Sequence, residues 1–273
     1  MLKQRILTVA VVLPLFLAVM FLAPNLVWAG LLAIVIGAAA FEWGRLAGFS
    51  ASGRALFVAL VVISCALVLL LGEVMPKAHF EKRLLYPLSL VAVLFWTTLA
   101  PAALHFHWPL RGGWIGTIAG WLVLVPAWLA AAHLQHEPLL LLLLLAAVWI
   151  ADTAAYFTGR RFGKRKLAPR ISPGKTIEGV AGAFVAVLIY VTIALRVYMP
   201  EAEAPTYVAL LVFGFILTAL SVEGDLIESW IKRQAGAKDS GDLLPGHGGI
   251  LDRIDSLTAT MPFAVLFFAG ILG

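Results

Sequence analysis

Apolar runs long enough to cross a lipid bilayer recur along the whole chain, and this feature restricts the fold more than any other. A helix needs about 20 residues to cross about 30 Å of hydrocarbon, since each residue adds about 1.5 Å. Such runs lie near residues 6–23, 26–41, 55–72, 84–104, 114–132, 138–158, 177–198, 205–222 and 257–273. The sequence therefore predicts an all-α, polytopic transmembrane helical bundle of about nine spans.

Composition supports this interpretation and excludes other classes of protein. Hydrophobic residues make up 62% of the 273 residues and charged residues 13%, whereas a soluble domain carries about 25% charged residues. The single cysteine, Cys65, excludes a disulfide scaffold. Lys3 and Arg5 precede the first apolar run, but a second run follows Pro24 at once, which favours a retained hairpin over a cleaved signal peptide.

The positions of lysine and arginine predict the orientation. The net charge is +5, but the positive residues gather in short loops beside apolar runs, so they indicate topology rather than nucleic-acid binding. With the N-terminus inside, 16 of the 20 Lys and Arg residues face the cytoplasm and 4 face outward. The positive-inside rule thus predicts a cytoplasmic N-terminus and an external C-terminus.

Two long inner loops, 159–176 and 223–256, carry an unusual mixture of charges. They hold 11 of the 20 positive residues, and the second loop also holds 7 of the 15 acids. Loops that only set topology need positive residues without matching carboxylates, so this mixture predicts a site for metal and phosphate together. We therefore divide the chain into supporting, lipid-facing transmembrane helices over 1–137 and transmembrane helices with cytoplasmic catalytic loops over 138–273.

The segment 221–233 offers half of such a site if it is helical. Asp225, Ser229 and Lys232 then fall on one face, as a carboxylate, a hydroxyl and an ammonium group. The alternative is a solvated helix beside the membrane, in which Glu228 and Lys232 form an ordinary i,i+4 ion pair without a role in a site. This segment alone leaves both interpretations open.

The glycine-rich segment 238–249 and the helix start that follows it favour a metal and phosphate site over a solvated helix. Glycines let backbone N–H groups approach an anion closely. Asp252 and Asp255 share a face at the start of the last span, where Asp225 can meet them across a helix pair. Carboxylates from different helices suit Mg²⁺ and leave positions for substrate phosphate. Helix capping explains one of these acids but not the set.

Two further residues favour a phosphate-binding site. Asp152 lies near the inner end of its span, and a carboxylate costs roughly 2.5–3.5 kcal/mol at the midplane, so we expect it to face a polar cavity. Lys175 follows Gly174 as in a P-loop, but that motif needs glycine at position 169, where the chain has Pro169. We expect Lys175 to reach phosphate from its loop instead.

The C-terminal half also resembles a known family. The matching residue types are Ser229, Lys232, Arg233, Lys238, Asp239, Gly241, Leu244, Pro245, His247, Gly248, Gly249, Ile250, Asp252, Arg253, Ile254 and Asp255. This spacing resembles the signature of bacterial phosphatidate cytidylyltransferases, also called CDP-diacylglycerol synthases. The stretches 156–164, 172–179 and 223–229 are similar as well, whereas residues 1–140 match only as apolar helices.

The resemblance implies an enzyme of phospholipid biosynthesis in the bacterial inner membrane, with its site facing the cytoplasm. It would transfer CMP from CTP to phosphatidic acid within the lipid bilayer. The implied cofactor is Mg²⁺, with a second cation and a homodimer left open and no nucleic acid as partner. The implied metal ligands are Asp225, Asp252 and Asp255. The catalytic candidates are Asp225, Asp252, Lys232, Arg233, Lys238, His247 and Arg253. The substrate-binding candidates are Asp152, Ser172, Lys175, Ser229, Asp239, Gly248 and Gly249.

Two other functions stay open at this point. A CTP-dependent lipid-alcohol kinase would transfer the γ-phosphoryl group and is disfavoured only by the length of the matching signature. A cation-coupled transporter would place its acids near the midplane, whereas these acids gather at one interface.

Overall fold

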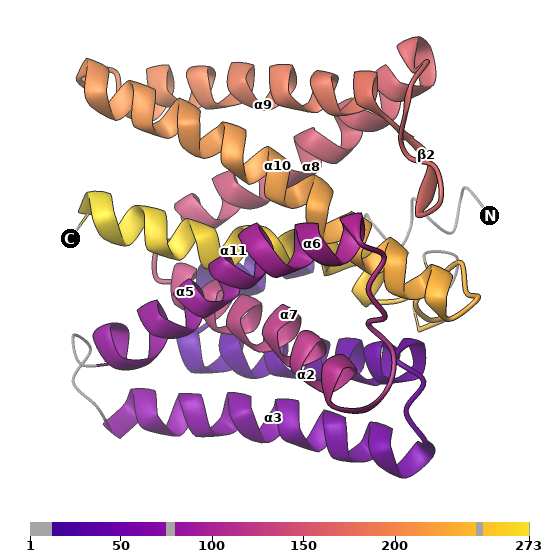
Figure 1. Cartoon of the computed structure of the whole chain (residues 1–273). Helices are drawn as coiled ribbons and strands as arrows, with labels where there is room; N and C mark the ends of the chain where they lie inside the picture. The colour runs from indigo at the N-terminus through magenta and orange to yellow at the C-terminus, as the bar shows by residue number, and fades with distance from the viewer. Residues whose placement is uncertain (1–12, 75–79, 244–247, 273) are drawn as a thin grey trace.

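The computed structural model describes residues 13–74, 80–243 and 248–272, and helices make up most of them (Figure 1). After a short helix at Leu13–Leu22, the helices are α2 (Asn25–Leu46), α3 (Ala51–Val74), η1 (Glu81–Leu85), α5 (Tyr86–Leu94), η2 (Phe95–Leu99), α6 (Ala100–His105), α7 (Gly113–Leu134), α8 (Pro138–Phe162), α9 (Ile177–Tyr198), α10 (Ala204–Gln234) and α11 (Leu251–Leu272). The strands β1 (Lys166–Ala168) and β2 (Ser172–Thr176) pair antiparallel between α8 and α9. The predicted all-α architecture is confirmed, with this one hairpin added.

The predicted spans agree with the helices. Seven helical stretches in the described part of the chain are long and apolar enough to cross a membrane: α2, α3, the run from Arg83 to His105, α7, α8, α9 and α10. The other two predicted spans correspond to the helix Leu13–Leu22 and to α11. The first predicted span begins at residue 6, so its part before residue 13 lies outside the described residues.

The two predicted loops differ in extent from the structure. Helix α10 has 31 residues, about 46 Å at about 1.5 Å per residue, which exceeds the hydrocarbon thickness of about 30 Å. The connection predicted over 223–256 is therefore helical to Gln234 and again from Leu251. The loop predicted over 159–176 begins as the last turn of α8 and continues as the β1–β2 hairpin. Charged residues such as Glu, Lys and Arg end the apolar pattern but favour the helix, so falling hydropathy marks the membrane edge rather than the helix end.

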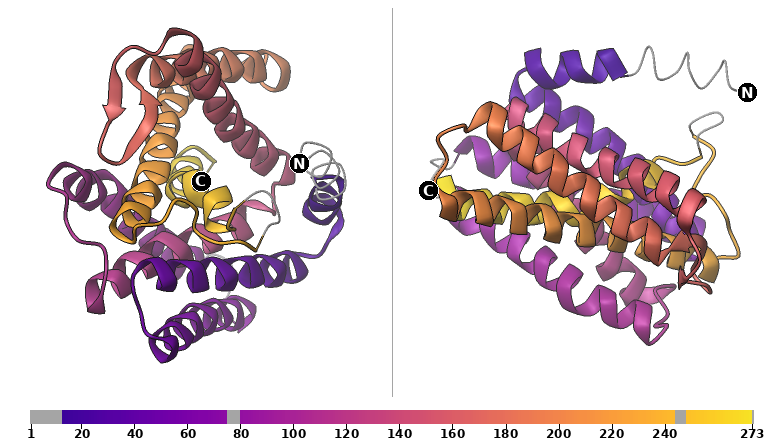
Figure 2. Two further views of the ribbon diagram at one scale, coloured as in Figure 1. Left: turned by 90° about the vertical axis from the view of Figure 1, so that its right-hand side faces the viewer. Right: turned by 90° about the horizontal axis from the view of Figure 1, so that it is seen from above.

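Helix α11 lies at the centre of the bundle (Figure 2). It packs against α10 on one side and against α7 and α5 on the other, while α2 and α3 pack outside α7. The main core contains the buried Trp43, Trp96 and Trp128 and extends to Ile227 and Leu251. Helix α11 therefore joins the two halves of the chain.

One end of the bundle gathers the polar connections. The C-terminal ends of α2, α8 and α10 and the first turns of α7 and α11 all lie there (Figure 1). A hydrogen bond of 3.0 Å from Arg233 Nε to the Ile171 carbonyl joins α10 to the hairpin connection. The two charged segments thus lie on the same side, as predicted.

Candidate active site

Three carboxylates from α10 and α11 converge at this end of the bundle. Asp225, Glu228 and Asp255 each offer an oxygen, and these oxygens lie within 4.8 Å of one another. Asp225 and Glu228 share a helix face because they are three residues apart. Gly224 permits the close approach of α11, because a side chain there would collide with the main-chain carbonyl of Asp255.

This carboxylate cluster (Asp225, Glu228 and Asp255) fits a small divalent cation. Mg²⁺ binds oxygen at about 2.0–2.1 Å in a near-octahedral arrangement, so its ligand oxygens lie at most about 4 Å apart. The three cluster oxygens, which lie within 4.8 Å of one another, are close to that spacing. Glu228 Oε1 is buried and has no hydrogen-bond partner among the described residues. A buried oxygen without a partner is costly, and a bound cation would satisfy it.

Lys175 brings a positive charge from β2 to the same place. Its Nζ lies 2.7 Å from Asp225 Oδ2 and 3.5 Å from the main-chain oxygen of Val222. Asp152 of α8 interacts electrostatically with Lys175, Asp225 and Asp255. Four predicted residues from different elements therefore lie near one another: Asp152, Lys175, Asp225 and Asp255.

Lys232 links this cluster to Asp252. Its Nζ lies 2.7 Å from Glu228 Oε2 and 2.6 Å from Asp252 Oδ1. The other oxygen, Asp252 Oδ2, accepts the N–H groups of Ser240 and Gly249, each at 2.9 Å. Burial opposes ionisation, but hydrogen bonds from Lys232, Gly249 and Ser240 hold the pKa of Asp252 below its usual range. Asp252 thus fixes both Lys232 and the glycine-rich segment, and its assignment as a metal ligand stays a prediction.

The remaining predicted residues lie around the cluster. Ser229 Oγ donates to Asp225 Oδ1 at 3.1 Å, as their shared helix face predicts. Ser172 is half-buried at the start of β2. Gly248 has a φ of +82°, in the left-handed region that favours glycine. Exposed side chains at this end of the bundle belong to Arg233, Lys238, Asp239 and Arg253. His247 lies outside the described residues.

Sequence reasoning missed two functional candidates. In the sequence Glu228 appears only as the partner of Lys232 in an i,i+4 ion pair, although the residue is buried, with 3% exposed. Glu42 in α2 was not considered, although it is 2% exposed and contacts the glycine-rich segment. The available signal for Glu42 was a carboxylate in an otherwise apolar helix, which is costly unless it has partners.

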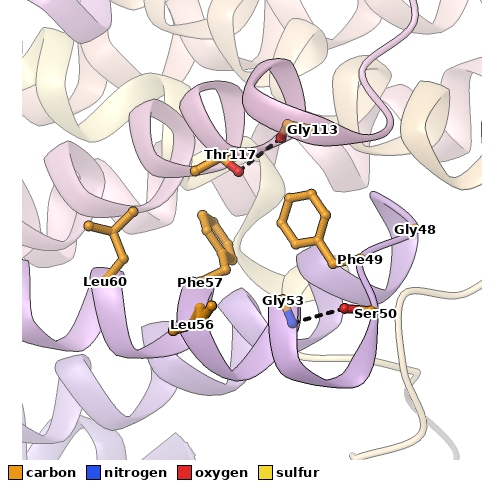
Figure 3. Close-up of a pocket in the computed structure, with 9 residues that line it drawn as sticks. All are labelled: Gly48, Phe49, Ser50, Gly53, Leu56, Phe57, Leu60, Gly113 and Thr117. Atoms are coloured by element: carbon orange, nitrogen blue, oxygen red, sulfur yellow. Dashed lines mark hydrogen bonds between the residues drawn. The ribbon is translucent and has the colours of Figure 1, made fainter.

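A separate cavity of about 480 Å³ lies between the first turns of α3 and α7. Figure 3 shows the rings of Phe49 and Phe57 between the two helices, with Thr117 bonded back to its own helix. The lining residues are Gly48, Phe49, Ser50, Gly53, Leu56, Phe57, Leu60, Gly113 and Thr117. None of the predicted site residues lines this cavity, so it is distinct from the carboxylate cluster.

One protein family and several known proteins are similar to this sequence. Residues 3–270 match the model of the cytidylyltransferase family. The phosphatidate cytidylyltransferase of Pseudomonas aeruginosa is 40% identical over 99% of this chain and 98% of its own length. The proteins of that name from Haemophilus influenzae and Bacillus subtilis are 46% and 47% identical, over 51% and 45% of this chain and 50% and 44% of their own lengths.

Proposed function

The chain belongs to the cytidylyltransferase family, and from this premise we infer that it transfers CMP from CTP to phosphatidic acid, giving CDP-diacylglycerol and pyrophosphate. The observation that carries this conclusion is the similarity to a phosphatidate cytidylyltransferase over 99% of the chain. The protein is accordingly a multi-pass membrane enzyme of phospholipid biosynthesis.

The reaction requires charge neutralisation more than covalent catalysis. An oxygen of the lipid phosphate attacks the α-phosphorus of CTP and forms a new P–O bond. The bond from the α-phosphorus to the oxygen that bridges to the β-phosphorus breaks, and pyrophosphate leaves with that oxygen. A phosphate monoester alone carries about −1.5 to −2 at neutral pH, so the two substrates repel each other. Positioning and positive charge supply the catalysis, and no protein nucleophile is needed.

We assign Asp225, Glu228 and Asp255 as the residues that would hold Mg²⁺. When bound there, Mg²⁺ would neutralise phosphate charge and orient the triphosphate. Glu228 enters this set in place of Asp252, because Glu228 Oε1 lacks a hydrogen-bond partner among the described residues, whereas both oxygens of Asp252 are engaged.

The positive side chains divide into two groups in this proposal. Lys232 is buried between two carboxylates and holds them in place. Lys175, paired with Asp225 in this structure, lies where it can bind a phosphate oxygen beside the cluster. Arg233, Lys238 and Arg253 are exposed around the same end and attract the polyanionic substrates.

The purified protein should release pyrophosphate from CTP only when phosphatidic acid and Mg²⁺ are both present. Chelation by EDTA should stop the reaction and added Mg²⁺ should restore it, because the carboxylate cluster needs its cation. Diacylglycerol in place of phosphatidic acid is the matched control and should give no product. Pyrophosphate release without lipid, or phosphate transfer to diacylglycerol, would contradict the proposed reaction.

We also place the site at the cytoplasmic face of a bacterial inner membrane, because CTP is available only there and 16 of 20 positive residues fall on that side. Cysteines introduced at the exposed Lys166 and Lys238 should resist a membrane-impermeant thiol reagent in intact cells and react after permeabilisation. Cys65 is 1% exposed, so the native background is low. A cysteine at exposed Glu201, in the opposite loop, should react in intact cells. Labelling of either inner position without permeabilisation would contradict this orientation.

A further inference from the structure

The carboxylate of Glu42 in α2 binds the start of a helix far away in the sequence. Its Oε1 accepts the N–H of Ile250 at 3.1 Å, and its Oε2 accepts the N–H of Leu251 and the hydroxyl of Ser240, each at 2.9 Å. The first N–H groups of a helix have no partner within that helix, and a negative charge is favourable beside them. Glu42 therefore caps α11 from 208 positions earlier in the chain.

Two glycines of the glycine-rich segment lie directly against this side chain. A side chain at Gly241 or at Gly249 would collide with the Glu42 carboxylate. One turn further along α2, the guanidinium group of Arg45 donates to the main-chain oxygen of Ser240. Two residues of α2 thus hold the same short stretch of the loop.

An unbroken series of contacts runs from Glu42 to the carboxylate cluster. The Ser240 hydroxyl, which donates to Glu42, accepts the N–H of Asp252 at 3.2 Å. Asp252 binds Lys232 at 2.6 Å, and Lys232 binds Glu228 at 2.7 Å. Each link is buried or partly buried, so solvent competes weakly with it.

We propose that Glu42 is a positioning residue for cytidylyl transfer. It holds the first turn of α11 and the nearby Ser240 in place, so that Asp252 and Lys232 keep Glu228 in the cluster. Glu42 itself does not touch the substrates. The inference rests on the proposed function. The sequence predicts a site within residues 138–273 alone, whereas Glu42 gives the N-terminal helices a part in positioning it.

The variant Glu42→Gln separates positioning from bulk. Glutamine has the same shape, but whichever way its amide is turned, its NH₂ group faces the N–H of Ile250 or of Leu251. We expect kcat to fall roughly ten- to hundredfold, as for the loss of a charge-assisted hydrogen bond, while KM for CTP stays within about threefold. Amide hydrogen exchange at Ile250 and Leu251 should become faster. Glu42→Asp, which keeps the acceptors on a shorter stem, should recover part of kcat.

Gln135→Met is the matched control for a lost buried polar anchor. Gln135 is 7% exposed, and its Nε2 donates to the carbonyls of Met20 and Ala23 at 3.1 and 3.0 Å, beyond the end of α7 remote from the site. The Gln135→Met variant should have lower stability than the wild type, but its kcat and its amide hydrogen exchange at Ile250 and Leu251 should be unchanged. An equal fall of kcat in this control would overturn the proposal, because loss of stability alone would then explain the Glu42 result.

If Glu42→Gln does not fold, Ser240→Ala tests the same series of contacts and should also lower kcat roughly tenfold or more. Wild-type kcat in a folded Glu42→Gln or Ser240→Ala variant would overturn the positioning role. A wild-type protein that forms no CDP-diacylglycerol would instead overturn the proposed function, so the two failures are distinguishable.

Discussion

Asparagine in place of Asp225 or Asp255 is expected to lower kcat by about a thousandfold or more, because each variant removes a charge that would hold Mg²⁺. A bound metal ion contributes several kcal/mol of transition-state stabilisation, and about 4 kcal/mol corresponds to about a thousandfold in rate. The exchange keeps the size of the side chain, so the packing of α10 against α11 should persist. Rates of CDP-diacylglycerol formation by the purified variants, with their elution as folded protein, check this expectation.

Asp242→Asn provides the control for these two variants. Asp242 is exposed at the same end of the molecule and lies outside the carboxylate cluster. Its loss should leave the rate near that of the wild type. A rate above one tenth of wild type, in either Asp225→Asn or Asp255→Asn, would contradict the assignment of the cluster as the metal site.

Lys232→Met should lower the free energy of unfolding by about 3–5 kcal/mol, the usual cost of removing one partner from a buried ion pair. The Lys232 side chain is 11% exposed and lies within 2.7 Å of both Glu228 and Asp252. Methionine fills the volume but leaves buried carboxylate charge without its partner. Unfolding by SDS titration in mixed micelles measures the change.

Arg165→Met is the counterpart at the surface. Arg165 Nε lies 3.1 Å from Glu178 Oε1, but its side chain is 72% exposed. Exposed ion pairs contribute at most about 1 kcal/mol, so this variant should unfold almost as the wild type does. Equal destabilisation by the two variants would show that burial of the Lys232 pairs has no energetic consequence.

The helices were predictable because few backbone structures can span a bilayer. Each apolar run must satisfy its backbone hydrogen bonds internally, so it becomes a helix, and every predicted span coincides with helical structure over the residues that are described. The length of α10 was not predictable in the same way. Hydropathy falls after residue 222 although the helix continues to Gln234, because the polar residues there are good helix formers.

The parts of the site that depend on the spacing of residues within one helix were predictable. Asp225 and Ser229 share a helix face in the sequence and are hydrogen-bonded in the structure, and Asp255 lies close to Asp225 across a helix pair as expected. Glu228, which we propose as a metal ligand in place of Asp252, was not predictable, because this proposal depends on the N–H groups of Ser240 and Gly249 that bind Asp252 Oδ2 in the folded chain. The role of Glu42 depends on contacts across 208 positions, and only the packing of α2 against α11 creates them.

CTP labelled with radioactive phosphorus at either the α- or the γ-position tests the central claim most directly. With phosphatidic acid and Mg²⁺, the α-label should enter the chloroform-soluble lipid while the γ-label leaves as pyrophosphate. Transfer of the γ-label to lipid would identify a kinase, and retention of both labels in CTP would show that the carboxylate cluster does not serve cytidylyl transfer.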